Sequence, residues 1–292
     1  MSRLDEAFGQ IRSEKRTGLV TYVTAGDPDL VRTRSILRTL DEAGADVLEV
    51  GVPFSDPLAD GPVIQRASER ARAGGTTLAA TLEMIGGARG ELRAPVVVFS
   101  YANPILAMGS QTFAARASDA GVDGVLALDL PIEEAGDFRA TMLDAGLDPI
   151  FLLSPTTSDA RIKRAAELGR GFLYGISRLG VTGARTELAD GAERMAARIR
   201  AQTQMPLALG FGVSTAEHVA AIGRWADAAV VGSALVSIIE KAAGDATLES
   251  ALAAYVQELT SGHGSARYAE GRVDETRRLE RHHGVRATDG RE

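Results

Sequence analysis

The 292-residue chain contains no cysteine, which excludes a disulfide framework, an iron–sulfur cluster, a thiolate zinc site and a cysteine nucleophile. No apolar run approaches the ~18–20 residues that a membrane-spanning helix needs. The N-terminus is charged from its third residue onward and lacks the apolar segment of a signal peptide. A formal net charge of −7 argues against nucleic acid as the main partner. We therefore expect a cytoplasmic protein that binds neither membranes nor nucleic acid.

Lysine and histidine are also scarce, and this removes several mechanisms. A Schiff-base aldolase needs a lysine at a strand end, but Lys15, Lys163 and Lys241 precede the first strand or lie in helices. A metal-dependent lyase needs clustered histidines and carboxylates, and His218 is the only histidine before residue 263. The residues at the strand ends do not suggest a Ser/His/Asp triad. We expect no metal and no cofactor in this chain.

Short apolar runs rich in β-branched residues alternate with amphipathic stretches that have helical spacing. Strict β–α alternation predicts a parallel sheet, and eight units in about 250 residues are typical of a closed (β/α)₈ TIM barrel. An open doubly wound sheet is the alternative, but the glycine fingerprint that usually opens its first helix is absent. The strands are expected at Leu19–Thr24, Val47–Gly51, Pro95–Ser100, Gly124–Leu128, Pro149–Leu153, Phe172–Ser177, Leu207–Phe211 and Ala228–Gly232.

The two ends of the chain differ in composition from the repeating middle. Arg3–Lys15 is expected to form an N-terminal helix that caps the bottom of the barrel. Residues 1–261 would form the catalytic barrel domain. Residues 262–292 are rich in arginine and acidic residues and poor in apolar ones, so we expect a disordered tail.

Carboxylates gather around the second strand. Glu49 lies inside an otherwise apolar strand, where burial would raise its pKa and suit it to general acid–base chemistry. The alternative is an ordinary ion pair with an arginine at the barrel mouth. The loop that follows, residues 53–62, carries Asp56 and Asp60 among three prolines; Asp-Pro and Asp-Gly pairs alone often indicate only turn geometry.

Glycine-rich turns follow the last three strands, at residues 177–183, 210–214 and 231–234. Glycine lets backbone N–H groups approach an anion, and a helix N-terminus adds partial positive charge. Loops after strands seven and eight commonly hold phosphate in such barrels. A single Gly-X-Gly marks any tight turn, but three neighbouring turns predict a phosphate monoester ligand.

The segment Leu48–Gln65 closely resembles the signature of the tryptophan synthase α subunit family. Further segments resemble the same family in order along residues 1–260: Thr24–Pro28, Tyr101–Pro104, Asp129–Pro131, Ser177–Gly183 and Gly210–Ser214. The resemblance implies a TIM-barrel lyase of tryptophan biosynthesis that reversibly cleaves indole-3-glycerol phosphate to indole and glyceraldehyde 3-phosphate. It also implies an α₂β₂ complex with a tryptophan synthase β subunit, which carries pyridoxal phosphate and receives the indole.

The resemblance also assigns roles to individual residues. Glu49 would be the principal acid–base residue, and Asp60 the carboxylate at the indole N–H. Tyr22 and Phe99, which stand where we expect Phe and Leu, would line the indole pocket together with Leu126. The remaining substrate-binding residues are Tyr174, Thr182 on a mobile loop, and the phosphate contacts Gly183, Phe211, Gly212, Gly232 and Ser233. Gly180–Gly183 and Arg185–Ala189 would belong to a lid.

Three other interpretations remain open. A standalone indole-releasing lyase would need no partner for activity. A catalytically silent regulatory subunit is opposed by intact Glu49 and Asp60. Another sugar phosphate could be the substrate, although the apolar pocket positions favour an aromatic group.

Overall fold

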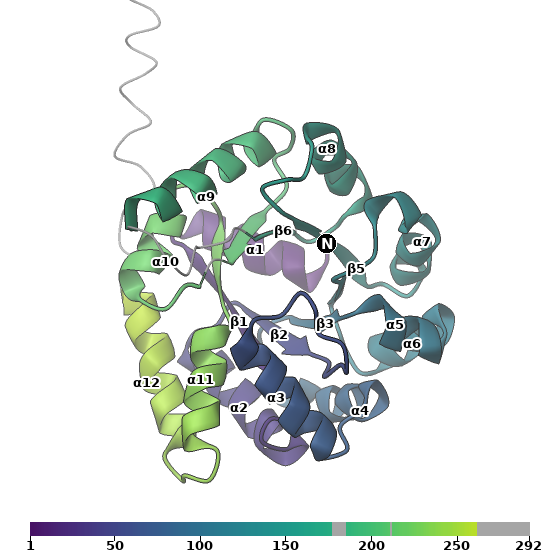
Figure 1. The fold of residues 1–292 in the computed structure, drawn as a ribbon. Coiled ribbons are helices and arrows are strands. Elements are labelled where there is room, and N and C mark those ends of the chain that lie inside the picture. The colour runs from purple at the N-terminus through teal and green to yellow at the C-terminus, as the bar shows by residue number, and fades with distance from the viewer. Residues whose placement is uncertain (177–184, 211, 262–292) are drawn as a thin grey trace, which may run out of the picture.

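The structure is a closed barrel of eight parallel strands in sequential order, β1 to β8, inside a ring of helices (Figure 1). This computed structural model describes residues 1–176, 185–210 and 212–261. The strands are β1 Gly18–Thr24, β2 Val47–Gly51, β3 Val96–Ser100, β4 Gly124–Ala127, β5 Asp148–Leu153, β6 Leu173–Ile176, β7 Leu207–Gly210 and β8 Ala228–Val231. The predicted fold class is confirmed.

Most helices follow a strand and begin with a residue suited to the helix N-terminus. Asp29 caps α2, and its side chain accepts a hydrogen bond from the Arg32 N–H; Thr77 and Ser158 cap α4 and α8 in the same way. The helices are α1 Arg3–Ser13, α2 Leu30–Ala43, α3 Pro62–Ala73, α4 Leu78–Ala88, α5 Ala102–Met108, α6 Ser110–Asp119, α7 Gly136–Asp144, α8 Asp159–Leu168, α9 Arg185–Arg200, α10 Ala216–Ile222, α11 Ser233–Ala242 and α12 Leu248–Ser261, with short 3₁₀ turns at Arg89–Glu91 and Ile132–Glu134.

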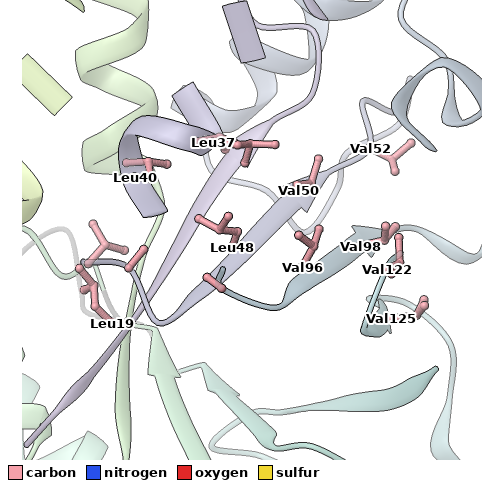
Figure 2. Packing of buried hydrophobic residues seen from close by; sticks show 14 of the residues in the cluster. Leu19, Leu37, Leu40, Leu48, Val50, Val52, Val96, Val98, Val122 and Val125 are labelled. Atoms are coloured by element: carbon pink, nitrogen blue, oxygen red, sulfur yellow. The ribbon is translucent and has the colours of Figure 1, made fainter. Parts of the chain in front are cut away.

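Each strand is buried on both faces, because one face lines the barrel interior and the other meets the helices. In β2, Leu48 and Val50 point outward and pack near Leu37 and Leu40 of α2 (Figure 2). Side chains alternate along a strand, so Glu49 points into the barrel. The alternation therefore decides the direction of this carboxyl group.

The predicted N-terminal capping helix is α1, which lies behind the ring of strands in Figure 1. Its residues Leu4, Phe8 and Ile11 are fully or almost fully buried and join the cluster inside the barrel. The ring of Phe8 lies 5.1 Å from that of Phe172, the residue just before β6, centroid to centroid. The bottom of the barrel is therefore filled by side chains.

Each strand boundary lies within one residue of its predicted position, but two helices differ more. The first helix ends at Ser13 because Lys15 adopts a left-handed conformation, with φ of 55°. Helix α9 begins at Arg185, so Arg185–Ala189, predicted as part of a lid, belongs to a helix. The rest of that lid and the tail at residues 262–292 lie outside the described residues. No helix in the described ranges is long and apolar enough to span a membrane.

Candidate active site

Glu49 is completely buried in the middle of β2. Neither of its carboxylate oxygens has a hydrogen-bond partner among the described residues. Burial in these surroundings raises its pKa to about 8, because the charged form loses its hydration and gains no compensating contact. The alternative of an ion pair with arginine is therefore not realised in the described part of the chain. At neutral pH the group holds a proton that it can donate.

Asp60 lies on the loop between β2 and α3 and is held by its neighbours. Burial raises its pKa to about 6, while a hydrogen bond from the Tyr101 hydroxyl, 3.1 Å from Oδ2, acts in the opposite direction. The same hydroxyl accepts a hydrogen bond from the Ala59 N–H at 3.0 Å. The Gln65 side chain donates to the Asp60 carbonyl at 2.8 Å. Asp60 is thus mostly ionised at pH 7, unlike Glu49.

Tyr101 is a site residue to which the sequence analysis assigned no role. Its ring stacks on Phe54 with centroids 4.9 Å apart, which fixes the hydroxyl over the Asp60 loop. One signal was available in the sequence. Tyr101 directly follows β3, and β3 is the neighbour of the strand that leads into the Asp60 loop.

A cavity of about 160 Å³ lies at the carboxyl ends of the strands. It is lined by the predicted residues Tyr22, Phe99, Tyr174, Gly212, Gly232 and Ser233, and by Ile64, Gly210, Val213 and Val230, to which the sequence analysis gave no binding role. Neither Glu49 nor Asp60 is among the lining residues, and Leu126 is fully buried within the barrel interior instead.

Three aromatic side chains form one wall of this cavity. The ring of Tyr22 meets Phe99 edge-on, with centroids 5.3 Å apart and an interplanar angle of 78°. The ring centroids of Phe99 and Tyr174 lie 6.4 Å apart. Ile64 of α3 packs against the same group. The wall is suited to a flat aromatic ligand.

Another part of the lining brings backbone groups close to the cavity. Gly212 has φ of 64°, a conformation that favours glycine. Gly232 precedes Ser233, the first residue of α11, so the N-terminus of this helix faces the cavity. Such a terminus favours an anion. The predicted contacts Thr182, Gly183 and Phe211 lie outside the described residues.

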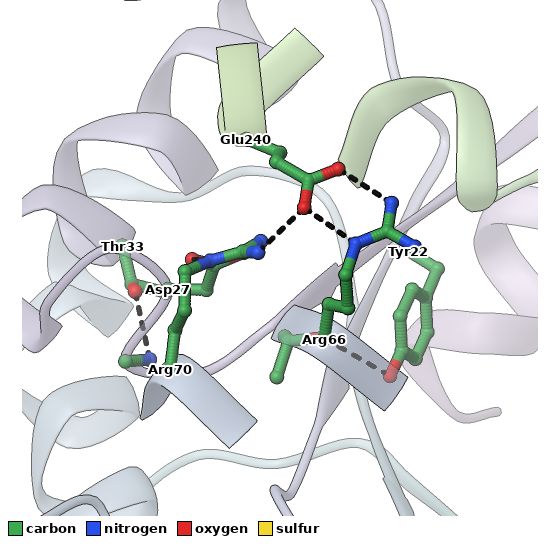
Figure 3. Close-up of polar contacts among 8 residues, drawn as sticks. Tyr22, Asp27, Thr33, Arg66, Arg70 and Glu240 are labelled. Atoms are coloured by element: carbon green, nitrogen blue, oxygen red, sulfur yellow. Dashed lines mark hydrogen bonds and ion pairs between the residues drawn. The ribbon is translucent and has the colours of Figure 1, made fainter. Parts of the chain in front are cut away.

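A network of charged side chains ties together the elements around the cavity (Figure 3). Arg70 of α3 donates two hydrogen bonds of 2.9 Å to the buried carboxylate of Asp27, in the loop between β1 and α2. It also contacts Glu240 of α11 at 2.8 Å, and Arg66 binds the same carboxylate through two bonds of 2.7 Å. The network holds α3, which follows Asp60, against α11, which begins at the cavity.

Comparison with known sequences gives one consistent result. The family model of the tryptophan synthase alpha chain matches residues 8–263. The tryptophan synthase alpha chain of Methylococcus capsulatus is 53% identical over 244 residues, covering 83% of this chain and 91% of the relative. The alpha chain of Citrifermentans bemidjiense is 47% identical over 262 residues, which cover 90% of this chain and 98% of that relative.

Solved structures agree with the sequence relatives. A crystal structure of tryptophan synthase subunit alpha from Legionella pneumophila has a TM-score of 0.82 at 37% identity, and covers 90% of this chain and 98% of that one. A tryptophan synthase structure from M. tuberculosis in its aminoacrylate-bound form has a TM-score of 0.81 at 33% identity. The match covers 90% of this chain and 100% of that one. The similarity therefore extends over the whole barrel.

Proposed function

This chain belongs to the tryptophan synthase alpha chain family, and from that membership we propose how the mouth of its barrel carries out the α-subunit reaction. The α subunit is a lyase of tryptophan biosynthesis. It reversibly cleaves indole-3-glycerol phosphate to indole and glyceraldehyde 3-phosphate, and the indole passes to a β subunit.

One observation carries the proposal: the buried carboxyl group of Glu49 and the half-buried one of Asp60, on one strand and its loop, have pKa values of about 8 and about 6. Environments that separate the pKa values of two similar groups assign them different roles. Glu49 is protonated at neutral pH and acts as the general acid, whereas Asp60 is an anion. A cavity with an aromatic wall and a helix N-terminus lies at the same end of the barrel.

In the cleavage direction Glu49 donates its proton to C3 of the indole ring. Asp60 stabilises the positive charge that develops at the ring nitrogen. The Glu49 carboxylate then accepts the proton of the side-chain hydroxyl on the carbon that becomes the aldehyde, and the carbon–carbon bond breaks with its electrons passing to the ring. Glu49 ends with the proton count with which it began, so the cycle needs no other acid or base.

The glycine-rich wall is proposed to bind the phosphate. Gly212, Gly232 and Ser233 contribute backbone N–H groups beside the N-terminus of α11, and Thr182, Gly183 and Phe211 belong to the same proposal through the family resemblance. Tyr22, Phe99, Tyr174 and Leu126 are proposed for the indole end. The chemistry uses side chains alone, so we propose that the chain needs no metal or cofactor of its own. Unchanged turnover after dialysis against a chelator would support this.

A β subunit is the partner that the family implies, and we propose an α₂β₂ complex. The loop after β2 and the helix after β3 support a docking surface at this end of the barrel. Leu58 is 93% exposed and Leu106 of α5 is 60% exposed, on the connections that follow neighbouring strands. Exposed apolar side chains of this size are suited to a protein partner. A cytoplasmic location stays a prediction.

The test is indole release from indole-3-glycerol phosphate by the purified chain, with and without a β subunit. Slow release that the partner accelerates strongly supports the proposal. Fast release that the partner does not change identifies a standalone lyase. Absence of release under both conditions contradicts the proposal and favours a silent subunit or another sugar phosphate as substrate.

A further inference from the structure

Tyr22 spans the cavity wall from its anion-binding end to its carboxylate end. Near Cβ, the side chain lies against Gly232, where an added methyl carbon would be 3.4 Å away. At its far end the ring crosses Gly51 of β2, where an added methyl carbon would lie 2.1 Å from the hydroxyl oxygen and 2.5 Å from Cζ. Only glycine at position 51 leaves room for this hydroxyl.

The hydroxyl occupies a small polar niche beyond the aromatic ring. It lies 3.4 Å from Oγ1 of Thr24, a buried residue two positions along the same strand. Figure 3 shows this contact as a dashed line from the tip of the Tyr22 ring. Burial and the charge of Asp60 raise the pKa of Tyr22, so the hydroxyl keeps its proton and lies within electrostatic reach of that carboxylate. The niche formed by Gly51 and Thr24 is therefore filled by an oxygen atom of the protein.

We propose that the Tyr22 hydroxyl is a specificity-determining group: it fills the niche over Gly51 beside Thr24 and thereby excludes indoles that carry a ring substituent directed into that niche. The proposal rests on the proposed function, because it treats the aromatic-walled cavity as the indole pocket. It concerns one atom of this side chain and leaves the acid–base chemistry unchanged.

The physical basis is a choice between two occupants of one small space. Protein interiors are close-packed, so a substituent can enter the niche only if the phenolic oxygen leaves it. Replacement of Tyr22 by Phe removes that oxygen and keeps the ring against Phe99. Thr24 then loses its hydroxyl neighbour, and a buried polar atom without a partner is costly. A hydroxyl group on the substrate would restore the contact, whereas a methyl group would only fill the space.

The experiment is the condensation of glyceraldehyde 3-phosphate with indole, with the 4-, 5-, 6- and 7-hydroxyindoles, and with the matching methylindoles. It compares the full-length chain with its Tyr22→Phe variant. For one hydroxyindole isomer, the variant is expected to raise kcat/KM relative to indole by about tenfold to a hundredfold, the range typical of one small group in a pocket. The methylindole of the same isomer should gain less.

Two further variants separate the niche from general loosening of the pocket. In Tyr22→Phe combined with Thr24→Val, the preference for hydroxyl over methyl should disappear while the gain in space remains. Tyr174→Phe removes a different hydroxyl, which lies near Gly210, and should not admit the isomer that Tyr22→Phe admits. Circular dichroism confirms that each variant is folded.

An unchanged ratio of hydroxyindole to indole in a folded Tyr22→Phe variant overturns the inference. So does an equal gain for all four isomers, which would indicate a looser cavity rather than a niche. These outcomes are distinct from failure of the proposed function. If the unaltered chain condenses indole, the proposed function stands whatever the ratios; if it does not, the proposed function itself is wrong.

Discussion

Carboxyl groups at the two ends of the barrel differ in their hydrogen-bond partners and in the direction of their pKa shifts. At the amino ends of the strands, Asp227 accepts hydrogen bonds from Arg12 at 3.0 and 3.2 Å, from Arg200, and from the Leu207 N–H at 2.9 Å. Burial alone would raise its pKa, but these contacts lower it to about 2. Glu49, more deeply buried inside the barrel, has no hydrogen-bond partner among the described residues, and its pKa rises to about 8.

The contrast separates stability from chemistry. Asp46, like Asp227, precedes a strand; it accepts two bonds from Arg16 at 2.6 and 2.7 Å and one from the Leu19 N–H at 2.8 Å. Both aspartates join their strands to neighbouring strands, and Asp227 also binds α1 through Arg12; their charge is compensated by arginines. Glu49 carries an uncompensated group that can give up and take back a proton. In a barrel of this kind the amino ends of the strands serve the fold and the carboxyl ends serve the reaction.

The largest effect is expected from Glu49→Gln, which removes the proton-transferring group and keeps its shape. Turnover of indole-3-glycerol phosphate should fall by about 10²–10⁴-fold, the usual contribution of a positioned acid or base. Measurement of indole release under saturating substrate tests this. Near-wild-type turnover in a folded variant would remove Glu49 from the mechanism.

The same variant also tests the pKa of Glu49. Because the folded-state pKa lies above the ordinary value of 4.5, ionisation of Glu49 opposes folding, and wild-type stability falls as the pH rises from about 4.5 to about 8. Urea unfolding should therefore show Glu49→Gln gaining stability relative to wild type between pH 5 and pH 9. A constant difference across this range would contradict the raised pKa.

Asp227→Asn is expected to act on stability instead of turnover. Loss of the charged hydrogen bonds should lower the free energy of unfolding by about 1–3 kcal/mol at pH 7, with both arginines partly exposed. Because the folded-state pKa lies below 3.8, the wild-type advantage is present above pH 4 and shrinks as the pH falls towards about 2. Urea unfolding at pH 7 and near pH 2 tests this. A loss of kcat as large as that of Glu49→Gln in the folded variant would contradict the assignment of the amino ends of the strands to stability alone.

Tyr101→Phe tests the carboxyl group of Asp60 at the carboxyl ends of the strands, because it removes a hydrogen bond to this carboxylate and keeps the ring stacked on Phe54. Its hydroxyl favours the charged form of Asp60, so its loss should move the pKa of Asp60 above about 6. The acid limb of the kcat/KM profile should shift to higher pH, with a loss of about threefold to tenfold near pH 6–7, the size of one net hydrogen bond. In an Asp60→Asn background the substitution should have no further effect on the profile, and an equal loss there would contradict the assignment.

The smallest effect is expected from Leu106→Asp at the proposed β-subunit surface. A charge on this exposed apolar side chain should reduce the acceleration by the β subunit by about threefold to tenfold, as for a contact outside the centre of an interface. Titration of the β subunit against indole release measures it. Ala73→Asp, on an exposed residue at the far end of α3, is the matched control, and an equal loss there would place the interface elsewhere.

Much of this arrangement could be predicted from local patterns. Alternating apolar runs and helical spacing identified all eight strands, the barrel and the capping helix. The position of Glu49 between Leu48 and Val50 also implies its inward direction, because neighbours on a strand face opposite ways. The Tyr101–Asp60 contact was not predicted, since it joins residues 41 positions apart on separate connections. The segment Arg185–Ala189 was predicted as part of a lid and not as the start of α9, because the polar sequence Arg185–Asp190 lacks the apolar spacing that indicates a helix.

The sequence by itself therefore determined the number and order of the strands and the residue types at each strand end, because these depend on spacing over a few neighbouring residues. The tertiary structure decided that Glu49 is unpaired, that Asp60 is held by Tyr101, and that the Tyr22 hydroxyl fills a niche over Gly51. Each of these depends on which side chains from distant segments exclude water from one another. A pKa value or a cavity wall depends on side chains from distant segments, and only folding brings these side chains together.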